Sequence, residues 1–183
     1  IVAVMSMDHK AFAFDHRGFA EGLRGQLLEA MRTGDCEPLR ALIDREPSAY
    51  QHPDEPGPLD PEWESIIGTN DVHALGDVAL TKYYEPMDDI GVDGDWMALD
   101  DILVRFGMRA LLLGEPLGSR EAGGYFDPGK MGSYFQTEAD VRSNLRRLDE
   151  ARRQHPDLVE KTRSVRAMLE RAAQAGRGIY ATF

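Results

Sequence analysis

The chain has 183 residues, of which 42% are hydrophobic, so it is long enough and apolar enough to form a hydrophobic core. Its 32 acidic and 21 basic residues give a net charge of -11. This balance argues against nucleic acid and against an anionic membrane as partners, because both are bound by clustered Lys and Arg. The single cysteine, Cys36, excludes an internal disulfide and favours a reducing compartment.

The negative charge is concentrated in the middle of the sequence. Residues 35–101 hold 18 carboxylates and only three basic side chains, whereas residues 138–183 hold seven acidic and ten basic side chains. Such an asymmetry is produced either by a solvated face or by a surface that recognises a charged partner.

The apolar run at residues 1–5 is too short for the core of a signal peptide. The longest later run, residues 110–113, is far shorter than a membrane span. We therefore expect a cytoplasmic protein without a membrane partner.

Short strands and then helices are predicted for the first part of the chain. Alternating apolar residues indicate strands at residues 1–5 and 10–14. Helical spacing of apolar residues predicts a helix over residues 17–32. A second helix is predicted between Pro38 and Pro47.

A proline-rich loop at residues 47–61 separates these elements from two further helices. Asp71 is placed to cap the first of them, which Pro86 ends. Residues 96–106 follow helical spacing and predict the second. The apolar run at residues 108–113 predicts a buried strand, with a short helix as the alternative.

The end of the chain is predicted to contain two helices and a strand after a glycine-rich loop at residues 116–133. Thr137 and Asp140 have the spacing of a capping box, and Pro156 suits the first turn of the last helix. Residues 179–183 predict a C-terminal strand. Together the elements predict a single compact α+β domain of all 183 residues, mostly helical, with a small mixed sheet that includes the C-terminal strand.

One acidic loop partly resembles the calcium-binding loop of an EF-hand. Asp89, Asp93 and Asp95 occupy ligand positions. Gly91 has no side-chain oxygen at another of these positions, and Asp100 stands where the bidentate Glu is expected. An exposed acidic loop is therefore predicted in preference to a metal site.

No catalytic residue and no cofactor is predicted. The histidines fall into no metal-binding spacing, and no nucleophile elbow, Walker loop or dinucleotide-binding motif is present. His73 is expected to share part of a helix face with Asp71 and Asp77, and a surface histidine among carboxylates is favoured. Cys36 lies near a helix start, where the dipole lowers a thiol pKa, but a structural cysteine is favoured.

Two regions are candidates for binding. The first is the acidic stretch at residues 35–101. The second is the loop at residues 123–135, where aromatic side chains and a lysine gather among glycines and either line a pocket, form a protein interface or pack into the core. The candidate binding residues are Asp88, Asp89, Asp93, Asp95, Trp96, Tyr125, Phe126, Lys130 and Tyr134.

Three stretches of the second half resemble the YfbM-like family of bacterial proteins of unknown function. They are residues 109–118 (RALLLGEPLG), residues 124–141, with Tyr, Phe and Pro before an Asp-Val helix start, and residues 168–183 (MLERAAQAGRGIYATF). Trp63 or Trp96 corresponds to a Trp that the family carries upstream. The resemblance implies a compact α+β domain without an established activity, and its relatives near bacterial toxin systems imply an immunity or partner-binding role.

The expected function is therefore the non-catalytic binding of a basic protein, such as a toxin, by the acidic surface at residues 35–101. Charge complementarity is the physical reason, since a negative field steers a cationic partner. The alternative is a small-molecule enzyme or ligand-binding protein that uses the loop at residues 123–135 together with His73.

Overall fold

The computed structural model describes residues 7–66, 70–129 and 131–183, and the predicted strand at residues 1–5 lies outside them. The chain forms two compact units. Unit 1 comprises Ile1–Phe14, Asp89–Glu115 and Tyr134–Phe183, and unit 2 comprises Asp15–Asp88 and Pro116–Ser133. The organisation of the whole chain as one domain stays a prediction.

A four-stranded sheet has the order β1-β6-β5-β2. Its strands are β1 (Lys10–Phe14), β2 (Glu115–Pro116), β5 (Ser133–Gln136) and β6 (Gly178–Thr182). Strands β1 and β6 are antiparallel, with Lys10 opposite Thr182 and Phe14 opposite Gly178. Every residue of β6 is buried, as expected for a strand that has a neighbour on each side and is covered on both faces.

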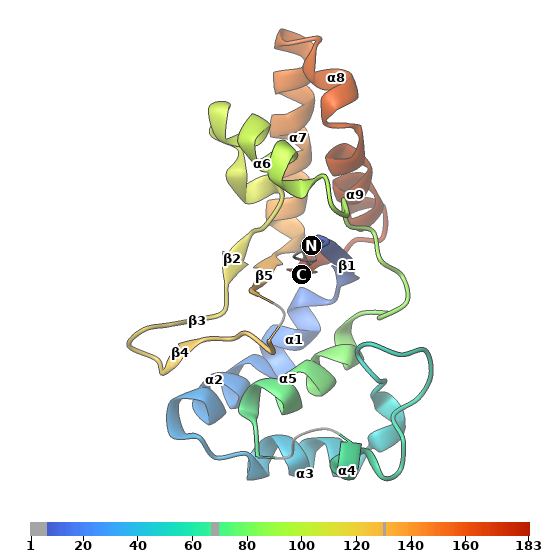
Figure 1. Ribbon diagram of the computed structural model, residues 1–183, viewed down its shortest axis with the longest axis vertical. Coiled ribbons are helices and arrows are strands. Elements are labelled where there is room, and N and C mark those ends of the chain that lie inside the picture. The colour runs from blue at the N-terminus through green and yellow to red at the C-terminus, as the bar shows by residue number, and fades with distance from the viewer. Residues whose placement is uncertain (1–6, 67–69, 130) are drawn as a thin grey trace, which may run out of the picture. The chain divides into compact units, whose positions relative to one another are not determined.

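The helices of unit 1 carry most of its core. They are α6 (Trp96–Arg105), the 3₁₀ helix η3 (Arg109–Leu111), α7 (Glu138–Gln154), α8 (Leu158–Lys161) and α9 (Arg163–Gln174). Helices α7 and α9 lie side by side (Figure 1) and bury Val141, Leu148, Val165 and Leu169 between the helices and the sheet. Each such side chain contributes roughly 1.5–3 kcal/mol by leaving water.

Helix α5 is the most buried element of unit 2. The unit contains α1 (His16–Gly22), α2 (Arg24–Thr33), α3 (Glu37–Arg45), the 3₁₀ helix η1 (Pro47–Ala49), α4 (Trp63–Ile66), α5 (Val72–Leu80), the 3₁₀ helix η2 (Thr81–Tyr83) and the hairpin β3 (Gly118–Ser119) and β4 (Gly124–Tyr125). Helices α2 and α3 pack against α5 (Figure 1). Seven of the nine residues of α5 are buried, which is why its sequence is apolar almost all round.

The structure confirms the α+β class, the predominance of helix and the C-terminal strand. The predicted strand at residues 108–113 is wrong, and the short-helix alternative is correct: the amide of Leu111 donates to the carbonyl of Met108, the N-cap of η3. The predicted helix over residues 17–32 is two helices that meet at Leu23, after Gly22, which weakens helix propensity.

The last predicted helix is also divided, at Thr162. The Thr162 hydroxyl donates to the carbonyl of Leu158 at 2.7 Å, a bond that competes with regular helix geometry. Among the described residues, no helix is long and apolar enough to cross a membrane.

Candidate functional site

The segment after Asp88 lies along β1 and is fixed there by its carboxylates and backbone. Asp89 Oδ1 accepts hydrogen bonds from the amides of Ala11 at 3.0 Å and Gly91 at 2.8 Å. His9 and Asp93 form an antiparallel bridge through N–O contacts of 3.2 and 3.1 Å. Asp89 thus already has a structural role, in holding this segment against β1.

Asp88, Asp95 and Trp96 are placed differently. Asp88, at the end of unit 2, and Asp95, just before α6, are exposed. Trp96 is half-buried: its indole N–H donates to the carbonyl of Met7 at 2.8 Å, and its ring lies 4.7 Å from that of Phe183. Within the described ranges, no group of three or more His, Cys, Asp or Glu side chains is arranged to hold a metal ion.

His9 is completely buried at the start of β1. Its Nε2–H donates to the carbonyl of Leu112 at 3.0 Å, and its Nδ1 accepts from the amide of Val92 at 3.3 Å, so both bonds fit the neutral ring. Burial lowers the pKa of His9, outweighing the hydrogen bonds and the attraction of Asp89 and Asp93, which raise it. His9 therefore joins three segments of unit 1 as an uncharged side chain.

The aromatic residues of the glycine-rich loop are divided between the two units. Tyr125 and Phe126 belong to unit 2, where Tyr125 is 49% exposed and Phe126 is buried. Tyr134 belongs to unit 1, is half-buried and packs edge-on against Phe183 with ring centroids 6.4 Å apart. Lys130 lies outside the described residues. Tyr134 thus belongs to a different unit from Tyr125 and Phe126.

The structure does bring His73 to this loop within unit 2. His73 Nδ1 accepts a hydrogen bond from the amide of Asp127 at 3.1 Å, and its ring stacks on Phe126 at 5.8 Å. Asp71 caps α5 by accepting from the amide of His73 at 2.8 Å, whereas Asp77 is buried in α5. His73 thus ties α5 to the loop, while the small-molecule pocket stays a prediction.

Cys36 is buried at the start of α3, and its thiol lies 3.9 Å from the carbonyl of Gly34. Burial is the largest influence on the pKa of this thiol and raises it, despite the opposing attraction of Arg40. At neutral pH the side chain is therefore a protonated thiol, which is a poor nucleophile.

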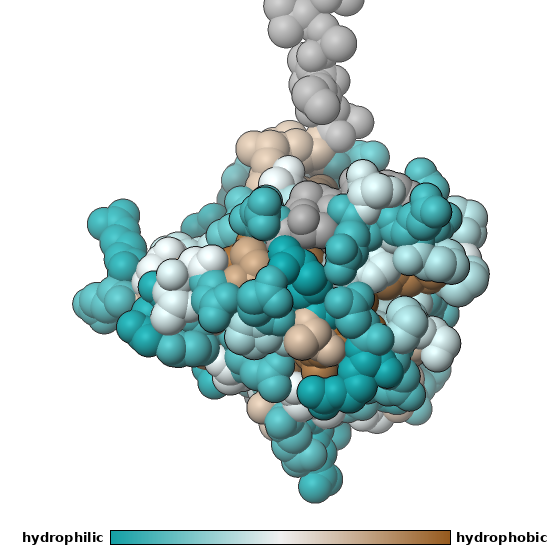
Figure 2. Space-filling view, turned by 90° about the horizontal axis from the view of Figure 1, so that it is seen from below, coloured by the Kyte–Doolittle hydropathy of each residue, from teal (hydrophilic) through white to brown (hydrophobic). Residues whose placement is uncertain are grey.

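The carboxylates of unit 2 form an exposed acidic surface. Residues 35–88 hold 13 carboxylates, and all except Asp77 are exposed. Only three basic side chains accompany them; Glu37 pairs with Arg40, and Glu46 lies 3.4 Å from Lys82. Figure 2, which looks at unit 2 from the side of α3 and α4, shows a mainly hydrophilic face.

A loop at residues 51–64 presents part of this charge on a fixed base. Gln51 and Pro58 form a β-bridge that closes the loop, and buried Tyr50, Leu59 and Trp63 anchor it. Burial raises the pKa of Tyr50 to about 12, so its hydroxyl stays neutral. The exposed carboxylates of the loop and of α4 are Asp54, Glu55, Asp60, Glu62 and Glu64.

Sequence reasoning missed a groove in unit 1. It has a volume of about 730 Å³ and runs along the C-terminal half of α7 beside the end of α6. The residues that line it are Phe106, Met108, Arg146, Arg147, Asp149, Glu150, Ala151, Arg153, Gln154 and His155. The excess of basic residues after position 138 was its only signal in the sequence.

No protein-family model, curated protein or solved structure matches this chain. The resemblance to the YfbM-like family therefore stays a prediction.

Proposed function

We propose that the chain is a non-catalytic binding protein of the bacterial cytoplasm that recognises a basic protein through the exposed carboxylates at residues 35–88. The observation that carries the proposal is the exposure of 12 of these 13 carboxylates beside only three basic side chains. The five carboxylates at residues 89–101 belong to unit 1, and two of the residues, Asp89 and Asp93, hold the segment beside β1.

Electrostatics gives this surface its specificity. A field of one sign raises the rate at which an oppositely charged protein associates, and it repels acidic competitors. The loop at residues 51–64 suits this role because its buried anchors fix the backbone, so that less conformational entropy is lost on binding. A cationic toxin, the partner implied by the family resemblance, has the required charge.

The test compares two variants with equal changes in net charge. In the loop variant, Asp54 and Asp60 become Asn, and Glu55, Glu62 and Glu64 become Gln. Asn preserves the oxygen with which Asp60 accepts from the amide of Glu62 at 2.7 Å. The control variant neutralises five exposed carboxylates outside residues 35–88, namely Glu21, Glu29, Asp95, Asp101 and Glu121.

Tagged protein is used at low salt to isolate a partner from cells, and the purified partner is then titrated by calorimetry over a range of salt concentrations. We expect a basic protein whose affinity falls steeply with salt and by at least about tenfold in the loop variant. The control variant should lose much less affinity for the partner. Equal affinity of both variants for the partner, or an acidic partner whose binding is insensitive to salt, would falsify the proposal.

A further inference from the structure

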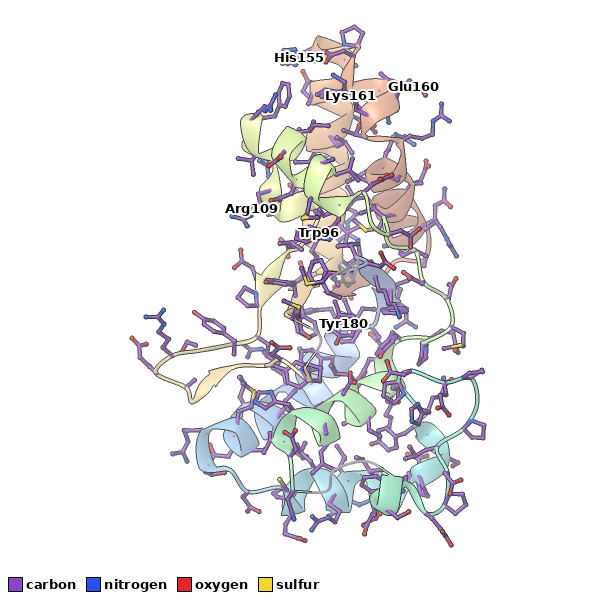
Figure 3. All side chains as sticks on the ribbon, in the orientation of Figure 1. Trp96, Arg109, His155, Glu160, Lys161 and Tyr180 are labelled. Atoms are coloured by element: carbon purple, nitrogen blue, oxygen red, sulfur yellow. The ribbon has the colours of Figure 1, made fainter. Side chains whose placement is uncertain are left out.

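The groove of unit 1 combines an apolar floor with a cationic rim. Met108 is buried beneath it, and Ala151 is partly buried. The ring of Phe106, which is 37% exposed, lies 5.0 Å from the ring of His155 at an angle of 57° and forms an aromatic wall. Figure 3 shows His155 at the end of α7 that is farther from the sheet of unit 1.

Most charges of the groove are already partnered. Arg147 donates to the carbonyl of Gly107 at 2.9 Å, and Arg153 pairs with Glu150. Asp149 accepts from Arg166 at 2.8 Å. These contacts fix the α7 side of the groove, and the charges of Arg153, Glu150 and Asp149 are neutralised by their partners, whereas Arg147 keeps its positive charge because a carbonyl is neutral.

Arg146 is different. It is exposed, it lines the groove, and it makes neither an ion pair nor a hydrogen bond to any other residue in the part of the chain that the structure describes. The negative end of the α7 dipole lies farther along the helix, where Arg152 and Arg153 occupy the last turn and offset it. Arg146 therefore supplies a positive charge that no other described residue engages, whereas the guanidinium of Arg147, which is also charged, is held by the carbonyl of Gly107.

We propose that this groove binds a small aromatic anion, an aryl carboxylate or aryl phosphate, with the anionic group on Arg146 and the ring against Phe106 and His155. A guanidinium binds both carboxylate and phosphate through paired hydrogen bonds. The aromatic wall offers a face on which a flat ring stacks. The volume of about 730 Å³ is in the range of small-molecule sites. The inference is independent of the proposed function, because it uses only residues of unit 1.

The test is a titration of the ¹⁵N-labelled full chain with phenyl phosphate and with benzoate, followed by amide chemical shifts. We expect saturable shifts at residues 106–108 and 146–155, with a dissociation constant below about 10 mM for at least one of the two anions. Comparison of the two anions distinguishes a phosphate from a carboxylate ligand. Inorganic phosphate, which has charge but no ring, should bind at least about tenfold more weakly.

Arg146→Gln should weaken binding by about tenfold or more, because it removes a charged hydrogen-bond donor. Arg142→Gln is the matched control: Arg142 is also an exposed arginine of α7, one turn earlier, and does not line the groove. It should change the dissociation constant by less than about threefold. Phe106→Leu keeps the apolar character of the wall but removes the ring and should weaken both aryl anions while leaving inorganic phosphate unchanged.

Three results would overturn the inference. They are the lack of saturable shifts with either aryl anion, shifts that map outside the groove, and equal losses in the Arg146 and Arg142 variants. Equal binding of inorganic phosphate would also overturn it, since the groove would then attract any adventitious anion. The amide spectrum of each unliganded variant shows directly whether the fold is retained.

Discussion

Two buried side-chain amides link three elements of unit 1. Gln136, which ends β5, is 1% exposed, and Asn144 of α7 is 6% exposed. Gln136 Nε2 donates to the carbonyl of Leu111 in η3 at 3.1 Å, and Gln136 Oε1 accepts from Asn144 Nδ2 at 2.9 Å. Gln136→Met preserves the length and approximate volume of the side chain but removes both hydrogen bonds.

The expected loss follows from the two groups that this change leaves buried. Each buried polar group that loses its partner costs about 1–3 kcal/mol, and the Leu111 carbonyl and the Asn144 amide are both affected. We therefore expect the free energy of unfolding to fall by about 2–6 kcal/mol. In the double variant Gln136→Met and Asn144→Leu, one of the two unpartnered groups is gone, so about 1–3 kcal/mol of stability should return.

The measurement is urea unfolding followed by circular dichroism at 25 °C, with an exposed residue of α7 as the control. Gln154→Met removes a hydrogen bond to Glu150 at the surface and should change stability by less than about 0.5 kcal/mol. The two amides are not coupled as described if Gln136→Met lowers the free energy of unfolding no more than this control does. The same conclusion follows if Asn144→Leu lowers it further in the double variant, as an independent substitution would.

Three further predictions concern stability. Thr137→Ala removes the capping box of α7 and should cost about 1 kcal/mol in urea unfolding, whereas Thr137→Ser should cost little. The pKa of His9 is lowered from 6.5 in the folded chain, so the unfolded chain binds more protons as the pH falls below that value, and the folded state should lose stability. In His9→Asn, the melting temperature measured by thermal melts should therefore fall less steeply between about pH 7 and pH 5 than in the unchanged chain. A Cβ on Gly91 would lie 2.2 Å from the backbone oxygen of His9, so Gly91→Ala should cost at least about 1–3 kcal/mol. Gly94→Ala is the control, because the atom nearest to a Cβ at that position is the end of a flexible side chain. If Gly94→Ala lowered the melting temperature as much as Gly91→Ala, this reasoning would be contradicted.

Local sequence signals predicted many elements because their causes are local. The capping box at Thr137 and Asp140 depends on residues three apart, and it is present in the structure. The strand at Lys10–Phe14 was predicted with the same bounds from its alternating pattern. Gly34, two residues after the predicted helix end at residue 32, takes the left-handed conformation at the C-cap of α2 with a φ of 75°. Such features depend only on residues that are close together in the sequence.

The errors occurred where distant parts of the chain decide the structure. The apolar run at residues 108–113 has the composition of a strand, but it forms η3, whose residue Leu111 accepts from Gln136, 25 positions away. Strand β5 was predicted as loop, because a strand of four residues has too few alternations to show a period.

Composition by itself determined the excess of acidic residues, since that depends only on the count of side chains. The structure decided which of them are available to a partner: 12 of the 13 carboxylates at residues 35–88 are exposed, while Asp89 holds the backbone beside β1. It also placed Phe106 next to His155, 49 positions apart, in a groove beside the unpaired Arg146. Sequence patterns report periodicity along one element, whereas a binding surface depends on side chains that only tertiary packing brings together.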